Sequence, residues 1–158
     1  MFSFPNPVNE VSARLVAGGV VLMCLATFVL GQPWIIVPLA YGFVARVLTG
    51  PTLSPLGQFV TRVLTPALPF APKWVPGPPK RFAQGIGALL SVTALVLAFA
   101  FDESTAAYIC VALILVAATL ESVFALCLGC KIFAVLMRSG IIPESVCEEC
   151  TDIWHRAA

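Results

Sequence analysis

The chain has 158 residues, of which 59% are hydrophobic and 11% are charged, and its mean hydropathy is +0.98. A soluble domain carries about 25% charged residues, so this chain has too few charges to solvate its own surface, which excludes an ordinary soluble domain. Its net charge of +1, without a basic stripe or stacking motif, argues against a nucleic-acid partner. We therefore expect an integral membrane protein.

The first long apolar run predicts two membrane spans joined by a tight turn. No charged residue occurs between Leu15 and Ala45, and Gly31-Gln32-Pro33 interrupts the run near its middle. Because a helix needs about 20 residues to cross a bilayer, we place the spans at about residues 11–30 and 34–48 and expect the second to be short.

Two local signals mark the start of the first helix. Asn6 followed by Pro7 is the pattern of a cap and a first helical residue, so we expect the helix to begin there. Glu10 and Arg14 are four residues apart, and on a helix this spacing favours an ion pair.

The segment from Thr49 to Arg81 differs in composition from the rest of the chain. Ser54-Pro55 is a helix-start signal, and apolar residues follow at helical spacing up to Leu64, which predicts a short amphipathic helix in the membrane interface. The stretch from Pro66 to Pro79 is too rich in proline for a helix or strand, so we expect an extended linker there.

The third span is predicted at about residues 82–101, between Lys80-Arg81 and Asp102-Glu103. The loop from Arg46 to Arg81 contains five basic residues and no acidic one, which places it in the cytoplasm by the positive-inside rule. With four spans, both chain termini are then predicted to be cytoplasmic.

The fourth apolar stretch predicts the last span, at about residues 106–130, and it carries the residues best suited to chemistry. Cys127 and Cys130 come at its cytoplasmic end, and Cys147 and Cys150 follow in a polar tail. The predicted fold is therefore all-α, with a four-span membrane domain over residues 1–137, an interfacial helix in its long loop, and a cysteine-containing cytoplasmic tail over residues 138–158.

These two C-x-x-C pairs allow two kinds of chemistry. The spacing C-x2-C-x16-C-x2-C falls within the four-thiolate pattern of zinc ribbons, so the four sulfurs could hold zinc or iron. C-x-x-C is also the spacing of dithiols that cycle with a disulfide. Because a static disulfide is not expected in the reducing cytoplasm, redox or sulfur transfer, metal binding and idle thiols stay open.

Local charge bears on which thiol attacks. Lys131 favours a thiolate at Cys130, whereas Glu148 and Glu149 disfavour thiolates in the tail pair. We expect attack by Cys127 or Cys130, with Cys147 and Cys150 exchanging electrons or sulfur with an outside partner.

Glu121 is the acidic residue inside the fourth predicted span. An ionised carboxylate in lipid is costly, so we expect Glu121 to be neutral, hydrated or paired with Arg14, Arg46 or Arg81. Six helical residues are about 600° of rotation, so Glu121 shares a face with Cys127 only if the helix is bent. A catalytic proton carrier and a structural charge partner are both open.

Several motifs together resemble a known family. They are Gly50-Pro51, Ser54-Pro55-Leu56-Gly57, the run Pro79-Lys80-Arg81-Phe82-Ala83-Gln84-Gly85, and Phe124 with Cys127-Leu128-Gly129-Cys130. The order of these motifs, after Arg14 in the first span, is similar to that of the small bacterial membrane proteins grouped as domain of unknown function 4395, over roughly residues 5 to 137. The resemblance implies a four-span inner-membrane protein, an association with thioredoxin-like and sulfurtransferase-like proteins, and a common site at Arg81, Gln84, Cys127 and Cys130. The tail pair lies beyond the family pattern.

Three functions are carried forward from the sequence. The leading hypothesis is a membrane thiol protein that handles redox equivalents or sulfane sulfur with a thioredoxin-like or rhodanese-like cytoplasmic partner. Such a protein could be a thiol-disulfide oxidoreductase or a sulfur-transfer accessory, and the sequence leaves open whether it is an enzyme. The second is a zinc- or iron-binding scaffold, and the third is a small transporter subunit. Assembly into a homo-oligomer is compatible with each of them.

Overall fold

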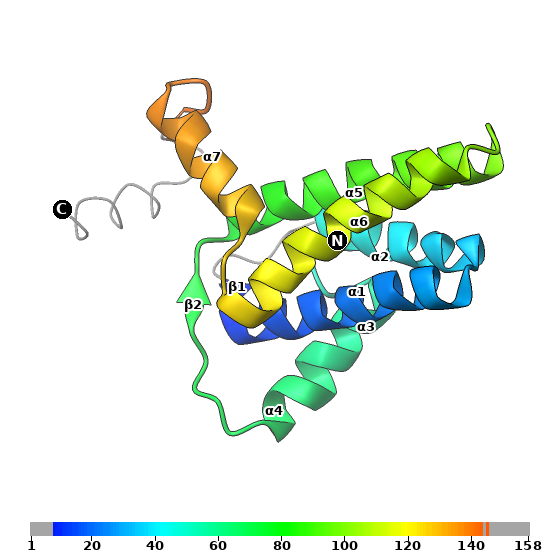
Figure 1. Cartoon of the computed structure of the whole chain (residues 1–158). Helices are drawn as coiled ribbons and strands as arrows, with labels where there is room; N and C mark the ends of the chain where they lie inside the picture. Colours follow the sequence, from blue (N-terminus) through cyan, green and yellow to red (C-terminus); the bar gives the residue numbers. More distant parts are fainter. Residues whose placement is uncertain (1–7, 144, 146–158) are drawn as a thin grey trace.

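The computed structural model describes residues 8–143 and 145. In this part the chain is almost entirely helical, as predicted, with one short pair of strands (Figure 1). The elements are β1 (Val8–Asn9), α1 (Glu10–Leu30), a 3-10 turn (Pro33–Ile35), α2 (Ile36–Thr49), α3 (Pro55–Phe59), a π-helical turn (Val60–Leu64), α4 (Thr65–Ala67), β2 (Trp74–Val75), α5 (Gly77–Phe99), α6 (Ser104–Phe124) and α7 (Leu128–Arg138).

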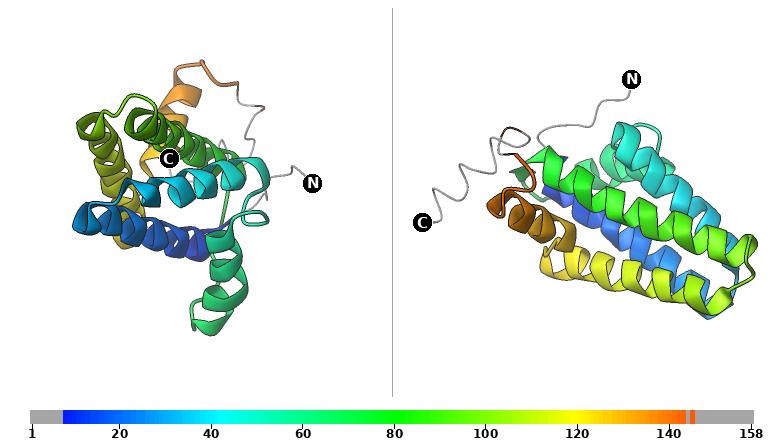
Figure 2. Two further views of the ribbon diagram at one scale, coloured as in Figure 1. Left: turned by 90° about the vertical axis from the view of Figure 1, so that its right-hand side faces the viewer. Right: turned by 90° about the horizontal axis from the view of Figure 1, so that it is seen from above.

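Four helices form a bundle of two hairpins, α1 with α2 and α5 with α6. Helix α1 packs on α6, α2 packs on α5, and α5 packs on α6 (Figure 2). Both hairpin turns lie at the same end, where the rings of Trp34 and Phe99 are 5.0 Å apart. Gly31 ends α1 with φ of 62°, a conformation that glycine adopts without strain. The opposite end of the bundle therefore collects the start of α1, the end of α2, the start of α5 and the end of α6.

Three helices are long and apolar enough to cross a membrane: α1, α5 and α6. The apolar helix over Pro33–Thr49 is shorter, as expected for the second span. Small and aliphatic side chains such as Val20, Leu39 and Ala94 fill the space between the helices. Large apolar side chains such as Leu89 and Val116 point outward and are exposed, which fits helices that face lipid. The prediction of four spans remains a prediction.

The long loop forms more regular structure than the sequence predicted. Ser54 caps α3, and helical turns continue to Ala67, so the predicted loop helix is present while its interfacial position stays a prediction. The extended linker expected from Pro66 to Pro79 is present only over residues 68–73, because α4 continues to Ala67, Trp74–Val75 pairs with Val8–Asn9, and α5 begins at Gly77. Two prolines occupy the first turn of α5, where a missing backbone N–H costs nothing.

The start of α1 differs from the prediction as well. Asn9 caps the helix by accepting a hydrogen bond from the backbone N–H of Val11, so the helix begins at Glu10, later than predicted; Asn6 and Pro7 lie outside the described residues. Glu10 pairs with Lys73 at 2.9 Å and not with Arg14. The β1–β2 pairing brings Lys73 beside the first turn of α1, which four-residue spacing on one helix could not reveal.

The predicted fourth span, residues 106–130, is two helices and not one. Helix α6 ends at Phe124, Ala125 adopts φ of 55°, and α7 begins at Leu128 and runs away from the α6 axis (Figure 1). A left-handed alanine costs about 1 kcal/mol, and this bend changes which side chains can meet.

Candidate functional site

Cys127 and Cys130 meet at the bend between α6 and α7. Cys127 is the N-cap of α7, and its sulfur accepts a hydrogen bond from the backbone N–H of Cys130 at 3.3 Å. The Cys127 side chain is buried and that of Cys130 is half-buried. Both are free thiols. A sulfur at this position lies next to the unpaired N–H groups of a helix start, where negative charge is favoured.

The surroundings of the two thiols separate their pKa values. The pKa of Cys127 is lowered because the Cys130 thiol donates a hydrogen bond to it, with further help from the nearby Lys80 cation; burial and Glu121 oppose this. The pKa of Cys130 is raised by the same hydrogen bond and by burial. Of the two thiols, Cys127 is therefore the one that more readily forms a thiolate. The expectation that Lys131 would make Cys130 the thiolate was wrong, because Lys131 is exposed and the contacts at the bend dominate.

Glu121 forms an ion pair with Lys80, not with an arginine. Lys80 Nζ lies 2.6 Å from Glu121 Oε1, and the two side chains are only 9% and 14% exposed. The sequence suggested Lys80 as a flank of the third span, but α5 starts at Gly77 and carries Lys80 inside the bundle. A buried pair of this kind persists because each charge compensates the other.

The predicted polar residues separate into different contacts. Arg46 donates to Gln84 Oε1 at 3.0 Å and to Ser54 Oγ at 3.2 Å. Arg14 instead donates to the carbonyls of Ser122 and Val123 at the end of α6. Arg81 donates to the carbonyl of Val47, near the end of α2. The last carbonyls of a helix lack partners in the helix and favour cations, so these two arginines join helix ends.

A close contact between α7 and α5 fixes the cysteines in place. A Cβ atom added at Gly129 would lie 2.4 Å from Ala83 Cβ and 2.5 Å from Ala83 Cα. Helix α7 can therefore rest on α5 only because residue 129 has no side chain. Phe133 of α7 packs against Phe82 of α5, with ring centroids 5.6 Å apart and the rings tilted by 58°, and extends the same contact.

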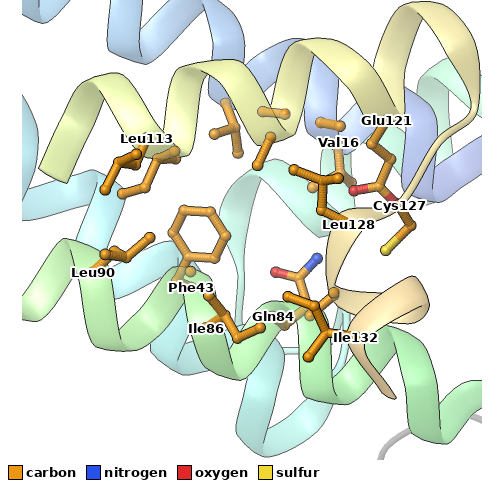
Figure 3. A pocket seen from close by; sticks show the side chains of 18 residues that line it. Val16, Phe43, Gln84, Ile86, Leu90, Leu113, Glu121, Cys127, Leu128 and Ile132 are labelled. Atoms are coloured by element: carbon orange, nitrogen blue, oxygen red, sulfur yellow. The ribbon is translucent and has the colours of Figure 1, made fainter. Parts of the chain in front are cut away.

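Cys127 lies between two hollows. One is a cavity of about 260 Å³ inside the bundle, lined mainly by apolar side chains, with Gln84, Glu121 and Cys127 as its polar lining (Figure 3). The second, of about 420 Å³, is lined by both cysteines and by Lys80 and Lys131. Glu121 and Cys127 thus face one cavity, which a straight helix would not allow.

No group of three or more metal-ligating side chains occurs within residues 8–143 and at 145. Cys147 and Cys150 lie outside the described residues, so their position relative to Cys127 and Cys130 stays a prediction. The same holds for an ion shared by the four sulfurs.

A comparison with protein-family models finds a match to the domain of unknown function DUF4395 over residues 8–138. The chain belongs to the DUF4395 family. The match extends from β1 to the last residue of α7, so the bend with Cys127 and Cys130 lies within the DUF4395 region and Cys147 and Cys150 lie beyond it. No curated protein and no solved structure matches the chain. Of the residues that the resemblance nominated for a DUF4395 site, Gln84 and Cys127 line one cavity, whereas Arg81 contacts the end of α2.

Proposed function

We propose that this protein is a membrane thiol protein in which Cys127 and Cys130 carry redox equivalents or sulfane sulfur. The observation that supports it most is the pairing of a lowered pKa at Cys127 with a raised pKa at Cys130, across a hydrogen-bonded C-x-x-C at a helix start. A dithiol that cycles needs one thiol that attacks and one that resolves, and these two environments supply both.

In the redox form of the proposal, the Cys127 thiolate attacks a disulfide of the partner. A mixed disulfide forms and a partner thiolate leaves with the electron pair. Cys130 then loses its proton and attacks the Cys127 sulfur, which gives a Cys127–Cys130 disulfide and a reduced partner. Two electrons pass from the pair to the partner, and the two partner sulfurs take up the proton of Cys130 and one proton from water.

In the sulfur-transfer form, the Cys127 thiolate attacks the outer sulfur of a partner persulfide. The sulfur–sulfur bond of the donor breaks, the donor thiolate leaves, and Cys127 becomes the persulfide. An acceptor thiolate then removes that sulfur in the same way, and no net oxidation occurs.

The partner of this reaction is proposed to be a thioredoxin-like or rhodanese-like protein on the cytoplasmic side. The excess of basic residues in the loop between α2 and α5 supports this orientation, in a bacterial inner membrane crossed four times with both termini inside. Cys147 and Cys150 are proposed to pass electrons or sulfur between the partner and the inner pair.

Exchange with a small disulfide and a small persulfide donor tests this function. Purified protein in detergent is incubated with oxidised glutathione or glutathione persulfide, and the mass of each cysteine-containing peptide is measured. We expect glutathione or one added sulfur on Cys127 first, and no adduct in Cys127→Ser. The variant Cys130→Ser should accumulate the mixed disulfide because nothing resolves it.

The matched control for this experiment is Cys110→Ala, because Cys110 is a half-buried thiol of α6 outside the bend. This variant should react as the native protein does. Equal labelling of Cys110 and Cys127, or reaction that survives Cys127→Ser, contradicts the proposed function. About one zinc or iron per chain, lost on replacing any one of the four paired cysteines, would replace it with the metal-scaffold alternative.

A further inference from the structure

The cavity beside Cys127 has the shape of a site for an apolar molecule with one polar group. Leu90, Leu113 and Phe43 form its walls away from the bend, while Glu121, Gln84 and Cys127 lie nearer the bend (Figure 3). An empty cavity of about 150 Å³ is known to accept benzene, so about 260 Å³ is room for a substituted six-membered ring.

The cavity is continuous with the outer surface of the bundle. Leu113 of α6, and Leu128 and Ile132 of α7, line the cavity and are also 53%, 38% and 47% exposed. Helix α6 is apolar enough to cross a membrane, so its outward face meets hydrocarbon. A ring with a long apolar tail can therefore enter sideways from the lipid and leave its tail outside the protein.

The polar groups of the cavity suit a carbonyl oxygen on that ring. Arg46 has only donors, so the Gln84 oxygen must face Arg46 and the Gln84 amide nitrogen is the remaining donor. The nucleophilic Cys127 sulfur lines the same cavity. A lipid acyl chain has no group that would accept a hydrogen bond from Gln84 or react with the Cys127 sulfur. A quinone has both, because its carbonyl oxygen accepts a hydrogen bond and its ring carbons react with thiolates.

We propose that this cavity binds a membrane quinone, which accepts the two electrons of the Cys127–Cys130 dithiol. This inference depends on the proposed thiol function and names its electron acceptor. It applies to the redox form run in the opposite direction to the partner reduction described above: a reduced partner or a small thiol first converts a Cys127–Cys130 disulfide to the dithiol, and the quinone then reoxidises that dithiol.

The reaction balances with the groups present. The Cys127 thiolate adds to a ring carbon of the quinone, and a sulfur–carbon bond forms. Cys130 loses its proton and attacks the Cys127 sulfur, so that the sulfur–sulfur bond forms while the sulfur–carbon pair returns to the ring. The thiolate and the thiol are oxidised to a disulfide and the quinone is reduced to a quinol, whose two oxygens take one proton from Cys130 and one from water.

The test follows reduction of a short-chain ubiquinone analogue by the fully reduced protein in lipid nanodiscs, without oxygen. We expect one quinol for every two thiols lost in the native protein and in Cys110→Ala, and at least a tenfold loss of rate in Cys127→Ser. A second readout is saturable binding of the quinone to a Cys127→Ser/Cys130→Ser variant. This binding should be retained within a few fold, because the apolar walls and Gln84 are unchanged and serine keeps the shape of the cysteine side chain.

A blocked cavity separates quinone binding from thiol chemistry. Ala117 of α6 lines the cavity, and Ala112 of the same helix is half-buried outside its lining. Ala117→Leu should lower quinone binding and reduction at least tenfold and leave exchange with glutathione disulfide unchanged, whereas Ala112→Leu should change neither. Exchange with glutathione but no quinone binding or reduction would overturn the quinone site and leave the thiol function standing. If the native protein does not exchange with glutathione disulfide at all, both the quinone site and the thiol function are overturned.

Discussion

Lys80 Nζ lies 2.6 Å from Glu121 Oε1, and this ion pair joins the first turn of α5 to the last turns of α6 beside Cys127. Lys80 is buried and Glu121 is largely buried, at the polar end of an otherwise apolar bundle. Neither charge is stable there without the other, because burial of a single charge is costly. The pair therefore ties the position of the bend to the helix that α7 rests on.

Removing one member of this pair should destabilise the protein strongly. Lys80→Met leaves the Glu121 carboxylate without its partner, and we expect a loss of about 3–5 kcal/mol in the free energy of unfolding. The double variant Lys80→Met/Glu121→Met should recover most of that loss, because no buried charge remains. Denaturant unfolding in detergent measures both. A double variant as unstable as the sum of the single variants would contradict this account of the pair.

The pH dependence of thiol alkylation should follow the hydrogen bond between the two cysteines. The Cys130 thiol stabilises the Cys127 thiolate, so Cys130→Ala should raise the pKa of Cys127 and lower its alkylation rate at neutral pH. Cys130→Ser retains a donor and should shift the profile less. Alkylation by iodoacetamide, followed by peptide mass from pH 5 to 10, gives the midpoint. An unchanged midpoint in Cys130→Ala would show that the hydrogen bond does not tune Cys127.

Packing of α7 on α5 should be sensitive to a single methyl group. In Gly129→Ala the new Cβ overlaps Ala83, so α7 must move, and overpacking of this kind costs about 1–3 kcal/mol. We expect lower stability and slower labelling of Cys127. The matched control is Gly85→Ala on α5, where no atom lies within 4 Å of the new Cβ and the helix should gain about 0.5–1 kcal/mol. Equal effects of the two substitutions would contradict the contact.

The two ends of the bundle should lie on opposite sides of the membrane. Lys73 is 72% exposed near the bend, and Glu103 is exposed in the α5–α6 turn. With the four paired cysteines changed to serine, Lys73→Cys should react with an impermeant maleimide only from the cytoplasmic side and Glu103→Cys only from the other. Labelling of both from one side would refute the four-span arrangement.

Much of this architecture follows from apolar run lengths and turn signals. The hairpin at Gly31 and the spans around α1, α5 and α6 are predictable because lipid requires long uninterrupted helices. The bend at Ala125 was missed because alanine is a strong helix former, and no local signal marks its left-handed conformation.

The composition of the site was predictable only in part. The residue types suggested Cys127, Cys130 and Glu121, and the resemblance nominated Gln84 for the site, but neither indicated the hydrogen bond from Arg46 to Gln84. Lys80 was missed because its burial depends on where α5 begins, and that is set by the pairing of Trp74–Val75 with β1, a contact distant in sequence. Tertiary contacts of this kind leave no local pattern in the chain.

The central claim is that Cys127 and Cys130 change their covalent state during function. The most direct measurement is the mass of the protein and of its cysteine-containing peptides. Cells are treated with a thiol-oxidising disulfide or with a persulfide donor, or left untreated, and a thiol-blocking reagent is added at lysis before the protein is purified from the membranes. Before treatment, we predict that Cys127 and Cys130 carry the blocking group, as free thiols do. After treatment they should form a disulfide with each other or carry an added sulfur, while the masses of the Cys24 and Cys110 peptides stay the same in both samples. Cys127 and Cys130 that keep one unchanged mass under both treatments would contradict the account.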